Sequence, residues 1–408
     1  MRGQSIRSTL CLGAVLALSA CGGSGPGDGQ TPLMTAVTGA TGASVLTVAT
    51  QLFEEKALSA SGQQSCASCH VTANGHADPA GTRLPIGGAA LDKPGNRSSP
   101  TLHYLESNGP FRFVAGEPVG GFTWDGRADT RAAQAAGPLF DAVEMANPDV
   151  PTLAAKVRAL PYYADVAAQF GLSTESTDQQ VVLALQQALE TYQRLDTDYL
   201  LFNSRYDRYL DGTETLSAAE LRGLQIFNDP ARGQCAKCHP SQPLADGSRP
   251  LFTTFGYEAL GVPRNPDVLA NADPGFYDMG LCGPKRTDLS HRTDLCGRFK
   301  IPTLRNVAVT APYFHNAAVA TLDQAVAFYA TRDLDPARWY PTVNGEVDRF
   351  NDLPVALRGN VFRDAPFGQQ PGSPPRLSPG DVADLVAFLN TLTDDTARAP
   401  GGVRVGGR

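Results

Sequence analysis

Two short stretches of cysteine and histidine are the residues in this chain best suited to chemistry. Both read C-x-x-C-H: Cys66, Cys69 and His70 in the first, and Cys235, Cys238 and His239 in the second. This spacing is typical of c-type haem attachment, in which two thiols add to the porphyrin vinyl groups and the histidine binds the iron. A zinc site or a structural disulfide is the alternative, but a zinc site would need further paired donors that the sequence lacks. The two stretches therefore predict two covalently bound haems.

The first 20 residues are typical of an export signal. Arg2 and Arg7 precede an apolar run, residues 10–18, that is too short to span a membrane. The run leads into Leu18-Ser19-Ala20-Cys21, which resembles a bacterial lipobox, and ordinary cleavage near Ala20 is the alternative. We expect a signal peptide at 1–20, a lipid on Cys21 and a flexible tether at 21–45. The protein would then be periplasmic and anchored to the outer membrane.

Two cysteines remain outside the haem motifs and the signal region, Cys282 and Cys296. An even pair in an exported protein predicts a disulfide, with two free thiols as the alternative. The net charge of -7 makes a nucleic-acid partner implausible. No other stretch is apolar and long enough to span a membrane, so membrane contact is expected only through the lipid.

Each haem motif follows a similar apolar stretch, which ends in Phe53 before the first and in Phe227 before the second. A helix, a glycine-containing turn and then C-x-x-C-H is how a cytochrome c domain opens. We therefore predict a mainly α-helical fold of two tandem cytochrome c-type domains with long ordered loops, each with one haem. The N-terminal domain is expected at 46–200 and the C-terminal domain at 201–395, with a disordered tail at 396–408.

Further helices are predicted by the period of their apolar residues. Residues 181–192 keep one apolar face, and Ser176 with Gln179 has the pattern of a capping box before it. Thr321 and Ser378 are expected to cap two helices of the C-terminal domain.

The sixth iron ligand decides whether a haem transfers electrons or binds a substrate. The chain has four methionines, and its histidines outside the motifs are His76, His103, His291 and His315. Composition alone leaves the sixth ligand of both haems open.

Several further motifs occur in a familiar order. They are Trp124-Asp125-Gly126-Arg127, the segment 299–306 (FKIPTLRN) and the segment 310–315 (TAPYFH). With the two C-x-x-C-H motifs, the chain resembles the bacterial dihaem cytochrome c peroxidase superfamily, which includes MauG, over residues 52–393. The resemblance implies that the N-terminal haem reacts with hydrogen peroxide and that the C-terminal haem relays electrons.

The resemblance also implies roles for single residues. The superfamily's peroxide-site glutamine, proline and glutamate match Gln134, Pro138 and Glu144. A carboxylate over an open iron can take the first proton of peroxide, and an amide beside it can orient the molecule. Trp124 matches the tryptophan that lies between the haems, where it can carry an oxidising equivalent, although a packed core tryptophan is the plain alternative.

The ligand of the second haem departs from ordinary peroxidases. They place a methionine on the helix after the Tyr-Phe-His segment, and the matching residue here is Tyr329. MauG-like members have a tyrosine ligand there, and a phenolate lowers the haem potential where a thioether raises it. The alternative is that Tyr329 is a core aromatic residue and the second haem is five-coordinate or bound by histidine.

Two other departures concern the first haem and calcium. Ordinary peroxidases often carry a removable histidine in the loop that matches residues 87–96, and this loop has none here. We therefore expect a peroxide site that is open without prior reduction. The family's calcium site would use the carbonyl groups of Thr310 and Pro312, and its asparagine is replaced by Ser98. Calcium is still expected.

Three functions follow from these observations. In the first, which is MauG-like, peroxide forms a high-valent dihaem state that oxidises a tryptophan or tyrosine of an exported partner protein. In the second, a cytochrome c peroxidase reduces hydrogen peroxide to water with electrons from a small cytochrome or cupredoxin. The third, a purely electron-transferring cytochrome, conflicts with the open first haem and with the pair Gln134 and Glu144. Tyr329 and the missing distal histidine favour the first.

Overall fold

The structure is a computed structural model that describes residues 44–78 and 84–395. The expected signal peptide, the lipid on Cys21, nearly all of the tether and the C-terminal tail lie outside the described residues. They stay predictions. No helix within the described ranges is long and apolar enough to cross a membrane.

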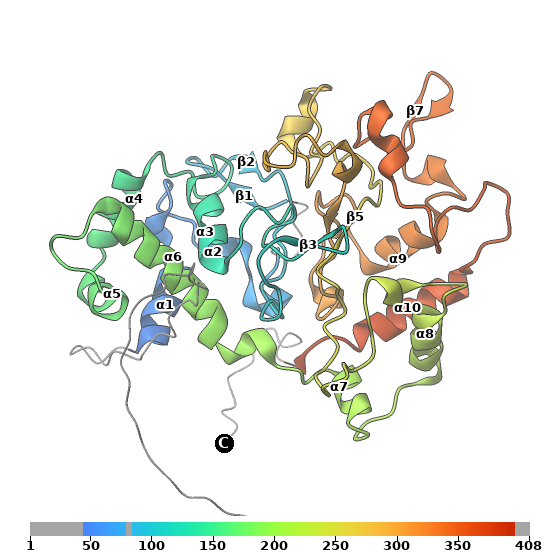
Figure 1. The fold of residues 1–408 in the computed structure, drawn as a ribbon, viewed down its shortest axis with the longest axis horizontal. Helices are drawn as coiled ribbons and strands as arrows, with labels where there is room; N and C mark the ends of the chain where they lie inside the picture. The colour runs from blue at the N-terminus through green and yellow to red at the C-terminus, as the bar shows by residue number, and fades with distance from the viewer. Residues whose placement is uncertain (1–43, 79–83, 396–408) are drawn as a thin grey trace, which may run out of the picture. The chain divides into compact units, whose positions relative to one another are not determined.

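The described chain is mainly helical, as the sequence predicts, and its helices are separated by long loops (Figure 1). The helices of the first half are α1 (Val45–Glu54), α2 (Cys66–Cys69), α3 (Arg131–Phe140), α4 (Val150–Arg158), α5 (Tyr163–Phe170) and α6 (Asp178–Leu195). Those of the second half are α7 (Arg205–Leu210), α8 (Ala218–Asn228), α9 (Leu322–Thr331) and α10 (Pro379–Asn390).

The two largest hydrophobic cores of the described chain lie one in each half. In the first half, α6 packs against α1, α3 and α4, and its core residues run from Val48 to Tyr199. In the second half, α10 packs against α8 and α9, and the core runs from Tyr206 to Leu392. The core residues change from one cluster to the other between Tyr199 and Tyr206, and the domain boundary near residue 200 stays a prediction.

The strands are short and form four antiparallel pairs in the described residues. The pairs are β1 (Ile86–Gly87) with β2 (Lys93–Pro94), β3 (Arg112–Val114) with β4 (Glu117–Val119), β5 (Tyr257–Glu258) with β6 (Phe299–Lys300), and β7 (Thr342–Val343) with β8 (Glu346–Val347). A bridge between Val119 and Gly256 connects the second pair to the third. This bridge joins backbone from the two halves.

Local capping signals place most helix ends. Thr321 and Ser378 are the N-caps of α9 and α10, which confirms both predictions. The prediction for α6 was wrong by one residue, because Thr177 is the N-cap and Gln180 completes the capping box. The hydroxyl of Ser176 instead accepts a hydrogen bond from the backbone N–H of Ser173 in the preceding turn.

The cysteines outside the haem motifs are paired as the sequence predicts. Cys282 and Cys296 form a disulfide with a Cα–Cα distance of 5.0 Å, and both are buried. The disulfide closes a loop of the second half that lies beside the first cavity described below. A cross-link of this kind limits the conformations of the loop.

Candidate active site

The first haem motif lies on a single helical turn at the wall of a cavity. Cys66 and Cys69 begin and end α2, and the N–H of His70 donates to the carbonyl of Cys66 at 2.9 Å. The ring Nδ1 of His70 donates to the carbonyl of His76 at 2.9 Å. Because Nδ1 carries this proton, Nε2 is left with the free lone pair that an iron requires.

The second motif repeats this arrangement. Cys235 opens a short 3-10 turn, and the N–H of His239 donates to its carbonyl at 2.9 Å. The Nδ1 of His239 donates to the carbonyl of Phe252 at 2.7 Å, so that Nε2 is again free. Phe53 of α1 and Phe227 of α8 line the first and the second cavity, which matches the repeated approach in the sequence.

The residues present fit two covalently attached haems. None of the four motif cysteines forms a disulfide, and burial raises the pKa of Cys66 and of Cys235 to about 12. Both cysteines line cavities whose walls are largely apolar, which fits an apolar macrocycle. The zinc alternative lacks support, since no three His, Cys, Asp or Glu side chains gather as a metal site in residues 44–78 and 84–395.

The proposed peroxide residues meet in the first cavity. Gln134 and Pro138 lie on α3, Glu144 lies in the turn after it, and all three line the cavity that holds His70. Of the described residues that line this cavity, His70 is the only histidine. The structure therefore brings together the residues that the sequence predicts and leaves the opposite side of His70 without a histidine.

Glu144 is held in place by its backbone. Its N–H donates to the carbonyl of Asp141, and its carbonyl accepts from Gly88 at 2.7 Å. Gly87 packs so closely that a Cβ there would lie 2.4 Å from the carbonyl oxygen of Val143. Burial, with the charge of Asp141, raises the pKa of the Glu144 carboxyl above its usual range. A carboxyl with a raised pKa is suited to exchange protons near neutral pH.

Trp124 lies between the two cavities, because it lines both of them. Its indole N–H donates to the carbonyl of Ser98 at 2.9 Å, and its own carbonyl accepts from the N–H of Lys300 at 2.8 Å. The residue is thus held by backbone from both halves of the chain, its ring by Ser98 and its own backbone by Lys300.

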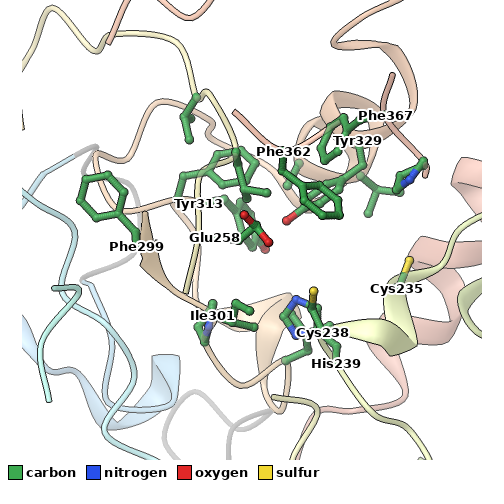
Figure 2. Close-up of a pocket in the computed structure, with 18 of the residues that line it drawn as sticks. Cys235, Cys238, His239, Glu258, Phe299, Ile301, Tyr313, Tyr329, Phe362 and Phe367 are labelled. Carbon is green, nitrogen blue, oxygen red and sulfur yellow. The ribbon is translucent and has the colours of Figure 1, made fainter. Parts of the chain in front are cut away.

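Tyr329 projects into the second cavity from α9. Figure 2 shows it on the side of the cavity opposite His239 and Cys238. Its ring stacks on Phe367 with centroids 5.2 Å apart, and burial raises the pKa of its hydroxyl. A phenolate at this position therefore needs a neighbouring cation such as an iron.

Comparisons with known proteins agree with this geometry. A family described as di-haem cytochrome c peroxidase matches residues 46–215. The methylamine utilization protein MauG of Paracoccus denitrificans (strain Pd 1222) is 34% identical over 352 residues, which are 84% of this chain and 87% of that protein. The chain belongs to the dihaem cytochrome c peroxidase family.

Two further relatives place the chain within this family. The cytochrome c551 peroxidase of Nitrosomonas europaea is 32% identical over 67% of this chain and 69% of that protein. The crystal structure of the diheme peroxidase BthA from Burkholderia thailandensis E264 is 38% identical, with a TM-score of 0.80 over 87% of each chain. The protein is therefore a peroxide-dependent oxidoreductase with two cytochrome c-type domains and two c-type haems.

The family's calcium site is not tested by the described residues. The Ser98 hydroxyl, which replaces the usual asparagine, donates to the carbonyl of Phe314 at 2.8 Å. The Thr310 hydroxyl donates to the carbonyl of Val307, and Pro312 follows a cis peptide bond. Calcium therefore stays a prediction that rests on the carbonyl groups of Thr310 and Pro312.

The histidines outside the motifs lie away from the peroxide residues. His76 and His103 are buried and hydrogen-bonded to each other at 2.8 Å, and neither lines the first cavity. His315 lines the second cavity and stacks on Phe299 with centroids 3.5 Å apart. His76 and His103 therefore do not face the first cavity on the side opposite His70.

Charged residues of the site were missed by sequence reasoning. Arg97, Lys285 and Lys300 line the first cavity, and Glu258 lines the second. Burial lowers the pKa of Lys300 to about 7, and its ammonium group donates to the carbonyl of Gly120 at 2.5 Å. Lys300 lies within the segment 299–306, but no spacing pattern indicated that these residues, which are far apart in the sequence, would face the cavities.

Proposed function

We propose that this dihaem protein is a MauG-like oxidase. It would use hydrogen peroxide to oxidise a tryptophan or tyrosine residue of an exported partner protein. The observation that carries this proposal is Tyr329, which faces His239 across the second cavity. A phenolate ligand favours ferric iron, so the second haem would be a poor acceptor of electrons from a small donor protein.

When bound, the two haems supply the redox chemistry, namely the acceptance of two oxidising equivalents from peroxide. The residues of the first cavity would manage the protons. The Glu144 carboxylate takes a proton from one peroxide oxygen and returns it to the other, which leaves as water. The Gln134 amide on α3 would orient the peroxide, and Pro138 would restrict the space beside it.

The transfer of oxidising equivalents between the halves would use Trp124. This indole lines both cavities and donates its N–H to the carbonyl of Ser98 in the first half, while the backbone carbonyl of Trp124 accepts from Lys300 of the second half. The partner protein would react at the surface and would not need to enter either cavity. We also propose that calcium binds at the carbonyl groups of Thr310 and Pro312 and that a lipid on Cys21 anchors the exported protein.

The second candidate is a cytochrome c peroxidase that takes electrons from a small cytochrome or cupredoxin. The identity with the cytochrome c551 peroxidase of Nitrosomonas europaea favours this alternative. The two candidates differ in what the second haem must do first. An ordinary peroxidase needs a reduced second haem before it reacts, whereas the oxidase reacts in the fully ferric state.

The test is one equivalent of hydrogen peroxide added to the fully ferric protein with both haems attached. Optical and EPR spectroscopy follow the two haems together. We expect an immediate reaction in which the spectrum of the second, six-coordinate low-spin haem changes together with that of the first, high-spin haem. A protein that stays inert until the second haem is reduced would be an ordinary peroxidase, and the oxidase proposal would fail.

A further inference from the structure

A loop of the second half forms part of the wall of the first cavity. The disulfide loop, residues 282–296, is closed by the disulfide between Cys282 and Cys296. Its Arg286 donates to the carbonyl of Asp125 at 3.0 Å and lies over the ring of Phe111 at 3.7 Å. Both partners belong to the first half, so the loop is fixed against that half and not only against its own.

Lys285 of the disulfide loop reaches the peroxide residues. Its ammonium group pairs with Oδ2 of Asp141 at 2.5 Å, and both side chains are about three-quarters buried. Lys285 also lines the first cavity together with Gln134 and Glu144. A charged pair that is shielded from water is far less screened than a surface pair.

Asp141 organises the turn that carries Glu144. It ends α3, where its N–H donates to the carbonyl of Gly137, and its own carbonyl accepts from Glu144 and from Ala146. Its Oδ1 accepts from the N–H of Val143 at 3.2 Å. Oδ1 of Asp141 therefore accepts a hydrogen bond inside the turn, and Oδ2 pairs with Lys285.

We propose that the disulfide loop of the second half completes the peroxide site of the first half, with Lys285 as a positioning residue that fixes Asp141 and the turn carrying Glu144. The inference rests on the proposed role of Glu144 as the proton acceptor for peroxide. It assigns a function to a loop that carries none of the haem or peroxide motifs.

The charges around Glu144 give this arrangement a measurable consequence. Asp141 disfavours the Glu144 carboxylate, and Lys285, Arg127 and Arg97 favour it. Loss of the Lys285 charge removes one cation that favours the Glu144 carboxylate and weakens the compensation of Asp141, so the pKa of Glu144 rises further. Glu144 then becomes a base only at higher pH, and the pH profile of any step that needs it moves upward.

The experiment uses the protein with both haems attached and the variant Lys285→Met. The readout is the rate at which cyanide binds to the ferric first haem across pH. Neutral hydrogen cyanide must lose a proton on binding, and a distal carboxylate accepts it. We expect the midpoint of the profile to rise by about one pH unit, which is an approximately tenfold slower rate below the midpoint. The rate of reaction with peroxide is expected to move in parallel.

Three further variants make the result specific. Lys285→Arg keeps the charge and should keep the wild-type profile. Arg292→Met removes a charge from the same loop, where Arg292 pairs with Asp294, lies over the ring of Phe113 and does not line the first cavity, and it should leave the cyanide profile unchanged. In an Asp141→Asn background, Lys285→Met should have less than half of its effect, because the two residues act as a pair.

The outcomes separate this inference from the proposed function. If Lys285→Met has the wild-type cyanide profile while Glu144→Gln loses its pH dependence, the positioning role of Lys285 is wrong. If Glu144→Gln leaves the rates of cyanide binding and of the reaction with peroxide unchanged, the proposed role of Glu144 is wrong, and the inference fails with it. A Cys282→Ser/Cys296→Ser double variant that folds should shift the profile in the same direction as Lys285→Met. An unshifted profile there would show that the disulfide does not hold the loop in place.

Discussion

At the residue scale, the identity of one side chain separates the two candidate functions. His70 and His239 have the same environment, since each donates its Nδ1 proton to a backbone carbonyl. The opposite sides of the two cavities differ. The first presents Glu144 and Gln134, and the second presents Tyr329. The proposed roles, peroxide chemistry at the first haem and charge storage at the second, rest on this asymmetry.

Tyr329→Met tests the proposed ligand directly. A thioether stabilises ferrous iron relative to a phenolate, so the reduction potential of the second haem should rise by on the order of 100 mV or more. Spectroelectrochemical titration of the holoprotein measures this potential. Tyr313→Phe is the matched control, because Tyr313 lines the same cavity but donates its hydroxyl to the carbonyl of Val307. An unchanged potential in Tyr329→Met would remove Tyr329 from the iron.

At the element scale, the helices bring the site together by close backbone packing. Gly223 of α8 lies against α10 so tightly that a Cβ at this position would be 2.0 Å from the carbonyl oxygen of Asp384. The helix that leads to the second haem motif therefore depends on a residue without a side chain. The contact also keeps Phe227 and Phe388 packed with ring centroids 5.3 Å apart.

Gly223→Ala should destabilise the protein. An added methyl group in a packed contact costs about 1–3 kcal/mol, which exceeds the gain of at most ~1 kcal/mol from the better helix propensity of alanine. Urea unfolding of the holoprotein measures the loss. Gly359→Ala is the control, since a Cβ there meets nothing within 4 Å, and its free energy of unfolding should stay within about 0.5 kcal/mol of wild type. Equal stability of the two variants would contradict the packing argument.

The sequence predicted helices well where the signal came from neighbouring residues, such as an apolar period or a capping side chain. The apolar period and the caps located α6, α9 and α10, and Thr177 took the capping role expected of Ser176 because either residue has a glutamine three positions on. The sequence also indicated the haem motifs and, through a resemblance, Gln134, Glu144 and Tyr329. It gave no sign that Lys285 would pair with Asp141, because contacts between distant residues leave no spacing pattern.

At the scale of the whole molecule, buried charge connects the two halves. Arg97 of the first half donates to Asp125 at 2.9 Å and makes two hydrogen bonds to Asp278 of the second half, at 2.7 and 2.8 Å. All three side chains are largely buried. A guanidinium group shared by two carboxylates in this way fixes their relative orientation. The cavity that Arg97 lines is thereby tied to the segment that begins the disulfide loop.

Arg97→Met should therefore lower the free energy of unfolding by more than the loss of a surface ion pair would. Removal of one partner leaves the carboxylate of Asp278 buried without its counter-charge, and such changes cost about 3–5 kcal/mol. Urea unfolding at pH 7 with both haems attached measures the loss. Arg222→Met is the control, because Arg222 is more than half exposed in its pair with Asp384 and should cost less than about 1 kcal/mol.

The pH dependence of the stability lost in Arg97→Met tests whether the loss is electrostatic. Burial alone would raise the pKa of Asp125, but the charges of Arg97 and Arg127 lower it to about 2. The folded protein thus binds this proton less readily than the unfolded chain, whose aspartates titrate near 3.9. The stability that Asp125 contributes is complete above about pH 4 and is lost as the pH falls toward 2. The difference in free energy of unfolding between wild type and Arg97→Met should become smaller over that pH range. A difference that stays constant would mean that Arg97 acts through packing and not through charge.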